Sequence, residues 1–203
     1  MNDFAISTAW NCSRHNDACG IADEIKAVGF DSIELNFKLT KEAVEGFSPL
    51  VKNNQIKIVS LHNYCPLPEG VTKANASPDY YSLASLNKDE KEKALLHTKQ
   101  TIEYAQLLGA PCVVLHCGKV DIKDNSKRLI RMHLDGKKDS EEFIVMREDM
   151  IEQRQKNSRP YLESLLNSLD ELNRLIHRGS SKGFQDIAFN SFAFAQSYPL
   201  SLQ

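Results

Sequence analysis

Strand-like and helix-like patterns of hydrophobic and polar positions alternate over the first two-thirds of the chain. Short apolar runs have the composition of buried strands, and a segment with helical spacing follows each of them. The runs predicted as strands are residues 4–7, 32–36, 56–61 and 113–116. The segments predicted as helices are residues 21–28, about 40–53, 87–108 and a long region after residue 140.

The ends of the predicted helices carry recognisable signals. Thr40 is suited to cap the second helix, and Asn87 begins the third, with Glu90 placed for a capping box. Gly109 ends the third helix. The long last helical region is expected to break or kink near Pro160, because proline removes a backbone donor and crowds the preceding turn.

Alternating strands and helices with apolar strands indicate a parallel sheet covered by helices. A closed (β/α)8 barrel and an open doubly wound sheet both fit this order. The usual nucleotide signatures G-x-G-x-x-G after the first strand and G-x-x-x-x-G-K-[ST] are missing.

Two of the predicted strands deliver a histidine at their carboxyl ends, His62 and His116. In α/β sheets and barrels, this end is where ligands and metals bind. We therefore expect the two imidazoles to converge on one rim, where they could bind a metal, relay a proton or hold a sugar hydroxyl. A purely structural role for each histidine is the alternative.

Composition narrows the class of protein. The 203 residues are enough for one domain with a core, and the net charge of −2 gives no general electrostatic reason to bind duplex nucleic acid. No apolar run approaches the roughly 20 residues that span a bilayer, and the first residues do not form a secretory signal. We expect a cytoplasmic protein that does not enter the membrane and whose five cysteines are reduced.

The segment from residue 63 to residue 87 is a long loop with three prolines and the cluster Asp79-Tyr80-Tyr81. A connection of this length is more often functional or disordered than a plain link. A flexible insertion is the alternative.

Four sequence motifs, in order and spacing, resemble the xylose-isomerase-like TIM-barrel family, which contains sugar-phosphate isomerases and epimerases and is related to endonuclease IV. The motifs are Ser7-Thr8-Ala9-Trp10-Asn11 with Arg14-His15, Gly29 to Leu35, Ser60 to Pro66, and Ala105 to Ala110 followed by Val113 to His116. The resemblance covers about residues 3–177.

The resemblance implies a (β/α)8 TIM barrel, of which this chain holds only about the first four β/α units, with a divalent metal (Zn, Mn, Mg or Co) at the carboxyl face. The metal would polarise a sugar carbonyl while a carboxylate moves the neighbouring proton. His62 and His116 match zinc ligands of the endonuclease branch. Glu34, at the end of the second strand, is the catalytic candidate, and a solvated carboxylate at the rim is the alternative.

Four further residues are predicted to bind substrate: Trp10, Arg14, His15 and Asn63. Arg14 and His15 could bind a carboxylate or phosphate. Trp10 could stack on a sugar. A surface pair for the first two and plain packing for Trp10 are the alternatives.

The pattern breaks near residue 177. A TIM barrel typically needs about 250 residues, whereas here a domain of residues 1–177 is followed by a tail, 178–203, whose last part from residue 187 has no charged residue. We favour a frameshifted tail. A half-barrel that closes by pairing with a second copy and a divergent fifth strand at 187–194 are the alternatives.

The leading functional prediction is a sugar or sugar-phosphate isomerase or epimerase in truncated form, weakly active or inactive, which does not retain its metal firmly. The alternatives are zinc-dependent hydrolysis of abasic DNA, like that of endonuclease IV, and a non-catalytic fragment or assembly module. The expected partner is a small sugar or sugar phosphate. Self-association through open barrel edges is also expected.

Overall fold

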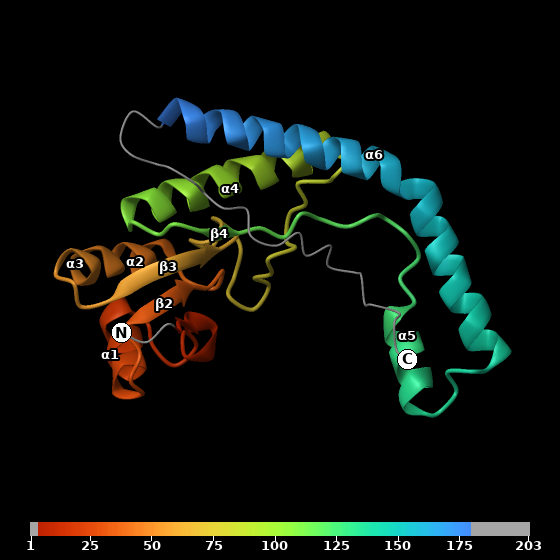
Figure 1. Cartoon of the computed structure of the whole chain (residues 1–203), viewed down its shortest axis with the longest axis horizontal. Coiled ribbons are helices and arrows are strands. Elements are labelled where there is room, and N and C mark those ends of the chain that lie inside the picture. The colour runs from red at the N-terminus through yellow and green to blue at the C-terminus, as the bar shows by residue number, and fades with distance from the viewer. Residues whose placement is uncertain (1–3, 180–203) are drawn as a thin grey trace.

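A computed structural model describes residues 4–179 of the chain. Four parallel strands form one sheet in the order β1-β2-β3-β4 (Figure 1). Their bounds are Ile6–Ser7, Ser32–Leu35, Lys57–His62 and Val113–Val114. The expected four β/α units of a TIM barrel are confirmed, since helices alternate with these strands and the described residues form a partial barrel.

The helices follow in chain order, and a 3-10 turn, η1, comes directly after β1. Their bounds are η1 Thr8–Trp10, α1 Ala18–Ala27, α2 Lys41–Glu45, α3 Phe47–Lys52, α4 Lys88–Leu107, α5 Ser126–Leu134 and α6 Glu141–Gly179. Among the described residues, no helix is both long and apolar enough to cross a membrane.

The two faces of the sheet differ in chemistry. Parallel pairing sets Ile33 beside Ile58 and Leu35 beside Leu61, and all four side chains are buried in the core with residues of α1, α3 and α4. Side chains alternate along a strand, and a register shift between Ile33 and Glu34 brings Ser60 to the side of Glu34, opposite the core. The register pairs Glu34 with Ser7 on one side and with Ser60 on the other. The sheet therefore has one apolar face against helices and one polar face.

The predicted helix starts are confirmed at two positions. The side chain of Thr40 accepts a hydrogen bond from the Ala43 amide, and that of Asn87 accepts one from the Glu90 amide. The reciprocal half of the capping box does not form, because the Glu90 carboxylate accepts from the Ser82 amide and the Ser85 hydroxyl instead.

The prediction of a single helix over residues 40–53 was wrong, because the structure has two helices there, α2 and α3. The break between them has a physical reason. Pro49 has no N–H to donate to the carbonyl of Glu45, so the ladder is interrupted at this point. Gly46 ends α2 and begins α3, and a Cβ atom there would lie 3.1 Å from the Cβ of Ala18 on α1. The break lets the chain pass close to α1.

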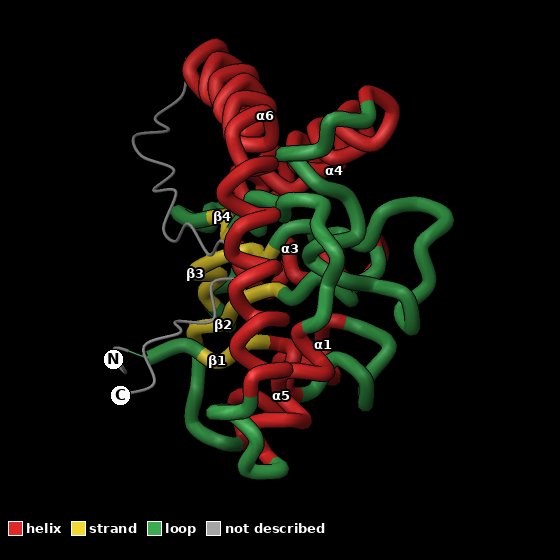
Figure 2. The backbone as a smooth tube through the Cα atoms, turned by 90° about the vertical axis from the view of Figure 1, so that its right-hand side faces the viewer, coloured by secondary structure: helices red, strands yellow, loops and turns green. Residues whose placement is uncertain are grey.

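The last helix, α6, is continuous through Pro160 and changes direction along its length, as the prediction of a kink requires (Figure 1). Its second half packs on α4, where Leu165 and Leu172 are buried. Its first half leaves the sheet and packs beside α5 (Figure 2). The predicted tail lies almost wholly outside the described residues, at 180–203, as do the explanations offered for it.

Candidate active site at the carboxyl ends of the strands

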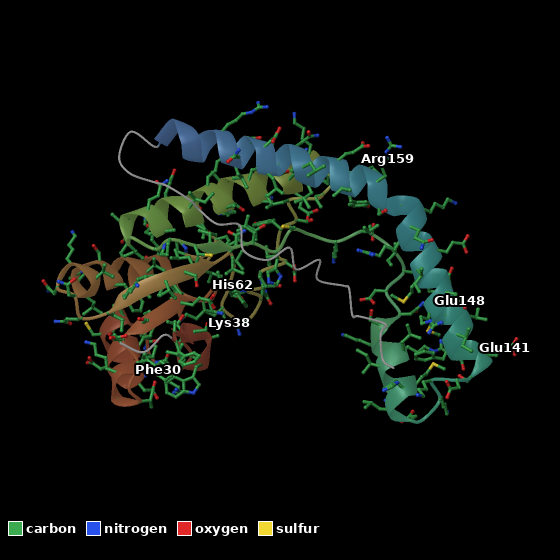
Figure 3. All side chains as sticks on the ribbon, viewed as in Figure 1. Phe30, Lys38, His62, Glu141, Glu148 and Arg159 are labelled. Carbon is green, nitrogen blue, oxygen red and sulfur yellow. The ribbon has the colours of Figure 1, made fainter. Side chains whose placement is uncertain are left out.

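The two histidines predicted to converge do so. Their ring centres lie 5.0 Å apart, with an angle of 51° between the planes. His62 is the last residue of β3, and the register places it beside Val114 of β4, two positions before His116 (Figure 3 labels His62). The parallel pairing of β3 and β4 therefore brings the imidazoles to one rim.

One ring nitrogen of His62 is hydrogen-bonded to the backbone of the next residue. Its Nδ1 lies 3.2 Å from the carbonyl oxygen of Asn63, and because a carbonyl only accepts, Nδ1 carries the proton. Burial lowers the pKa of His62, so the neutral ring is favoured near pH 7. The edge of the Phe37 ring covers it at a centroid distance of 5.4 Å. Its Nε2 is thereby left as an acceptor.

His116 has a carboxylate partner from a distant part of the chain. Its Nδ1 lies 3.1 Å from Oδ1 of Asp79, in the long loop before α4. Donation from His116 lowers the pKa of Asp79, so this carboxylate is ionised at neutral pH and accepts the proton of Nδ1. The sequence showed Asp79 only as part of a loop cluster, and its pairing with His116 is a tertiary contact.

Glu34 lies on the polar face, one strand away from His62. Its Oε2 accepts a hydrogen bond from the Ser60 hydroxyl at 3.0 Å, and its negative charge opposes the fall in the His62 pKa. The side chain is half-buried. The structure thus places the catalytic candidate next to the histidine pair, and its chemical role stays a prediction.

Arg14 and His15, which were also predicted to bind substrate, both contact a carboxylate of α1. Glu24 accepts from Arg14, with Nη2 at 2.9 Å, from His15 Nε2 at 2.6 Å and from Asn11 Nδ2 at 3.1 Å. The hydrogen bond to His15, helped by Arg14, lowers the pKa of Glu24 to about 2. The Arg14 guanidinium also lies 4.6 Å from the centre of the Trp10 ring. Glu24 had no signal in the sequence.

Asn63, also predicted to bind substrate, is fully buried. Its Nδ2 donates to the Thr98 hydroxyl and its Oδ1 accepts from the Thr101 hydroxyl, both at 2.9 Å and both on α4. Both polar groups of the side-chain amide are therefore hydrogen-bonded within the fold.

The two imidazoles fit part of the divalent-metal site that the resemblance implies. With a metal–nitrogen distance of about 2.0–2.1 Å, two imidazoles on one tetrahedral ion have ring centres about 5 Å apart, which His62 and His116 satisfy. Each ring has Nδ1 hydrogen-bonded, the arrangement typical of metal-ligating histidines. Yet the described residues contain no group of three or more candidate ligands. The pair fits two positions of a metal site and leaves the set incomplete.

Comparisons with known proteins agree with this architecture. The family model described as xylose isomerase-like TIM barrel matches residues 22–176. A D-tagatose 3-epimerase-like protein of known structure has a TM-score of 0.52 and 13% sequence identity, over 86% of this chain and 49% of that one. A xylose isomerase domain protein from Planctomyces limnophilus has a TM-score of 0.38, too low to support a shared fold, and 15% sequence identity, over 65% of this chain and 48% of that one. No curated protein matches.

The first of these likenesses supports the fold alone, because its sequence identity is low. The chain spans about half the length of both solved relatives. What a whole protein of this kind does is therefore a matter of proposal for this chain.

Proposed function

Because the chain belongs to the xylose isomerase-like TIM barrel family, we propose that it carries part of the active site of a sugar or sugar-phosphate isomerase or epimerase. The observation that supports this most directly is the pair of imidazoles 5.0 Å apart at the carboxyl rim. Glu34 lies on the neighbouring strand of the same polar face. Ligand sites of TIM-barrel enzymes are built at this end of the strands.

The three side chains proposed to act at this rim offer acceptors. His62 and His116 each have Nδ1 donating elsewhere, and an ionised Glu34 can only accept. Such a set suits a ligand rich in hydroxyl donors, or a cation. A sugar provides several hydroxyls that can donate to the two Nε2 atoms and so be held in one orientation.

In the proposed chemistry, Glu34 accepts the proton from the carbon next to the sugar carbonyl and returns it to a carbon of the same sugar molecule. The Ser60 hydroxyl, which donates to Oε2 of Glu34, holds the carboxylate in place. A divalent ion held by His62 and His116 would supply polarisation of the carbonyl. Since the described residues offer no complete ligand set, we expect the isolated chain to turn over slowly.

Proton abstraction is tested in heavy water, because exchange is detected even where net conversion is slow. The chain is incubated with five- and six-carbon ketoses and their phosphates, with Mn²⁺ or Co²⁺, and loss of the proton signal next to the carbonyl is followed by NMR. We expect exchange with at least one substrate, lost in Glu34→Gln and kept in Glu69→Gln, an exposed residue of the long loop.

Two results would contradict the proposal. One is the absence of exchange across the whole panel, and the other is exchange that Glu34→Gln leaves unchanged. Cleavage of an abasic DNA duplex in the presence of Zn²⁺, without sugar exchange, would instead favour a nuclease of the related branch.

A further inference from the structure

The segment of residues 63–87, here called the support loop, contains no helix or strand and yet places Asp79 against His116. We propose that Asp79 is a positioning residue that fixes the orientation and the tautomer of His116, and that the support loop is a rigid part of the site. The sequence favoured a functional or disordered loop over a plain connection, with a flexible insertion as the alternative, and gave no sign that Asp79 contacts His116.

The support loop is held first by α4. The Tyr81 ring stacks on the His97 ring of that helix, with centroids 5.5 Å apart and an angle of 11° between the planes. The buried Tyr64 hydroxyl donates to the Tyr81 carbonyl at 2.7 Å. The Cys65 amide donates to the Thr101 hydroxyl at 3.1 Å. Both ends of the loop are therefore tied to one face of α4.

The same loop is held a second time by α6. The Ser164 hydroxyl donates to the Ser85 carbonyl at 2.9 Å, and the Ser168 hydroxyl donates to the Leu83 carbonyl at 2.8 Å. Both serines are buried. Loop carbonyls that would otherwise need water are thus satisfied by a helix far along the sequence.

The exit of β4 closes the support loop from a third side. Gly118 has a φ of +107°, and a Cβ atom there would lie 2.3 Å from the Ser82 hydroxyl and 2.8 Å from the Ala84 Cβ. Only a residue without a side chain allows so close an approach. The strand segment that carries His116 and the loop that carries Asp79 are therefore packed directly against each other.

Three sets of contacts thus fix the start of the support loop at Tyr64 and Cys65 and the segment from Tyr81 to Ser85, which begins two residues after Asp79. Asp79 in turn contacts His116. An ionised carboxylate can only accept, so its contact with Nδ1 keeps the proton on that atom and leaves the Nε2 lone pair for a ligand. The tautomer does not depend on the proposed function. Only its consequence, an acceptor presented to a sugar or a cation, rests on that proposal.

The tautomer is read directly by long-range ¹H–¹⁵N correlation NMR of the full chain with labelled histidine, without metal or substrate. The His116 signals are assigned with His116→Gln, at a pH above which the imidazole signals no longer change. We expect the wild-type ring to carry its proton on Nδ1. Asp79→Ala removes the acceptor and should give the other tautomer or a mixture, whereas Asp79→Asn, whose amide oxygen still accepts, should restore the wild-type pattern.

The matched control is Glu69→Ala, which removes an exposed carboxylate from the same loop and should leave the His116 signals unchanged. A wild-type His116 protonated on Nε2 would overturn the inference, and this measurement needs no variant to fold. An unchanged Nδ1–H pattern in folded Asp79→Ala would overturn it as well. The expected tautomers in a chain that shows no sugar exchange would leave this inference standing and contradict only the proposed function.

Discussion

The imidazole rings of His62, the last residue of β3, and His116, two residues after β4, lie 5.0 Å apart although each has a different partner at Nδ1. The backbone carbonyl of Asn63 holds the first, and the Asp79 carboxylate holds the second. The result is a pair of neighbouring nitrogen acceptors at the rim of a parallel sheet.

This pair should bind Zn²⁺ or Co²⁺ weakly, because two protein ligands are fewer than the three of a usual catalytic zinc site. Titration followed by calorimetry, or by the visible spectrum of Co²⁺, should show binding that is lost in both His62→Gln and His116→Gln. The control is His133→Gln, which changes an exposed histidine on α5. Binding that survives both rim substitutions would place the metal elsewhere.

Gly118→Ala should destabilise the fold by about 2–4 kcal/mol, because the added methyl group meets Ser82 and Ala84 and the backbone has a positive φ. Gly136→Ala is the matched control, since Gly136 also has a positive φ, +74°, but its added Cβ meets nothing within 4 Å. Only the backbone cost, about 1–2 kcal/mol, applies there. Urea unfolding compares the two, and equal losses would argue against the close approach of β4 and the support loop.

Asn63→Ala should cost about 2–3 kcal/mol of unfolding free energy. It removes two hydrogen bonds and leaves the buried hydroxyls of Thr98 and Thr101 without this partner. Asn75→Ala, at an exposed position of the same loop, should change stability by no more than about 0.5 kcal/mol. A normally stable Asn63→Ala with reduced sugar binding would instead support the substrate-binding role expected from the sequence.

Stability should depend on pH through Glu24, whose pKa of about 2 in the folded chain lies below its ordinary value of 4.5. A carboxyl with a depressed pKa stabilises the fold above its unfolded pKa, and this contribution is lost as the pH falls from about 4.5 towards 2. Wild type should therefore be more stable than Glu24→Gln at pH 6, and the difference should shrink by pH 2.5.

Asp23→Asn, one position earlier and exposed, is the control for this effect. Its stability should follow that of wild type over the same pH range. A difference between wild type and Glu24→Gln that stays constant with pH would mean that the hydrogen bonds of His15 and Arg14 to Glu24 do not hold the carboxylate ionised.

Several features of the fold could be predicted because local physics decides them. Short apolar runs located the strands, and helical spacing located α4, whose buried stripe contains Ala94, Thr98 and Ile102. Side-chain caps at Thr40 and Asn87 need only neighbouring residues. The two strand-ending histidines were recognisable because all parallel strands present their carboxyl ends at the same rim.

Partners that are distant along the chain could not be predicted in this way. The sequence around Asp79 gives no sign that its carboxylate contacts His116. Nor does the sequence show that the hydroxyls of Ser164 and Ser168 donate to carbonyls of the support loop. Arg14 and His15 had the composition of an anion site, and the structure gives them the Glu24 carboxylate of α1. Which donor meets which acceptor depends on how α1, α4 and α6 pack.

The sequence by itself therefore determined the order of the strands and of the helices that follow them, apart from the break between α2 and α3 and the short helix α5. It also determined the caps at Thr40 and Asn87 and the rim to which His62 and His116 belong, because these follow from apolar runs, helical spacing and the chemistry of neighbouring residues. The tertiary structure alone decided which residues hold those imidazoles, which predicted site residues join them, and that a loop without regular structure is fixed in place. Those outcomes depend on contacts between segments far apart in the chain, and no local pattern encodes them.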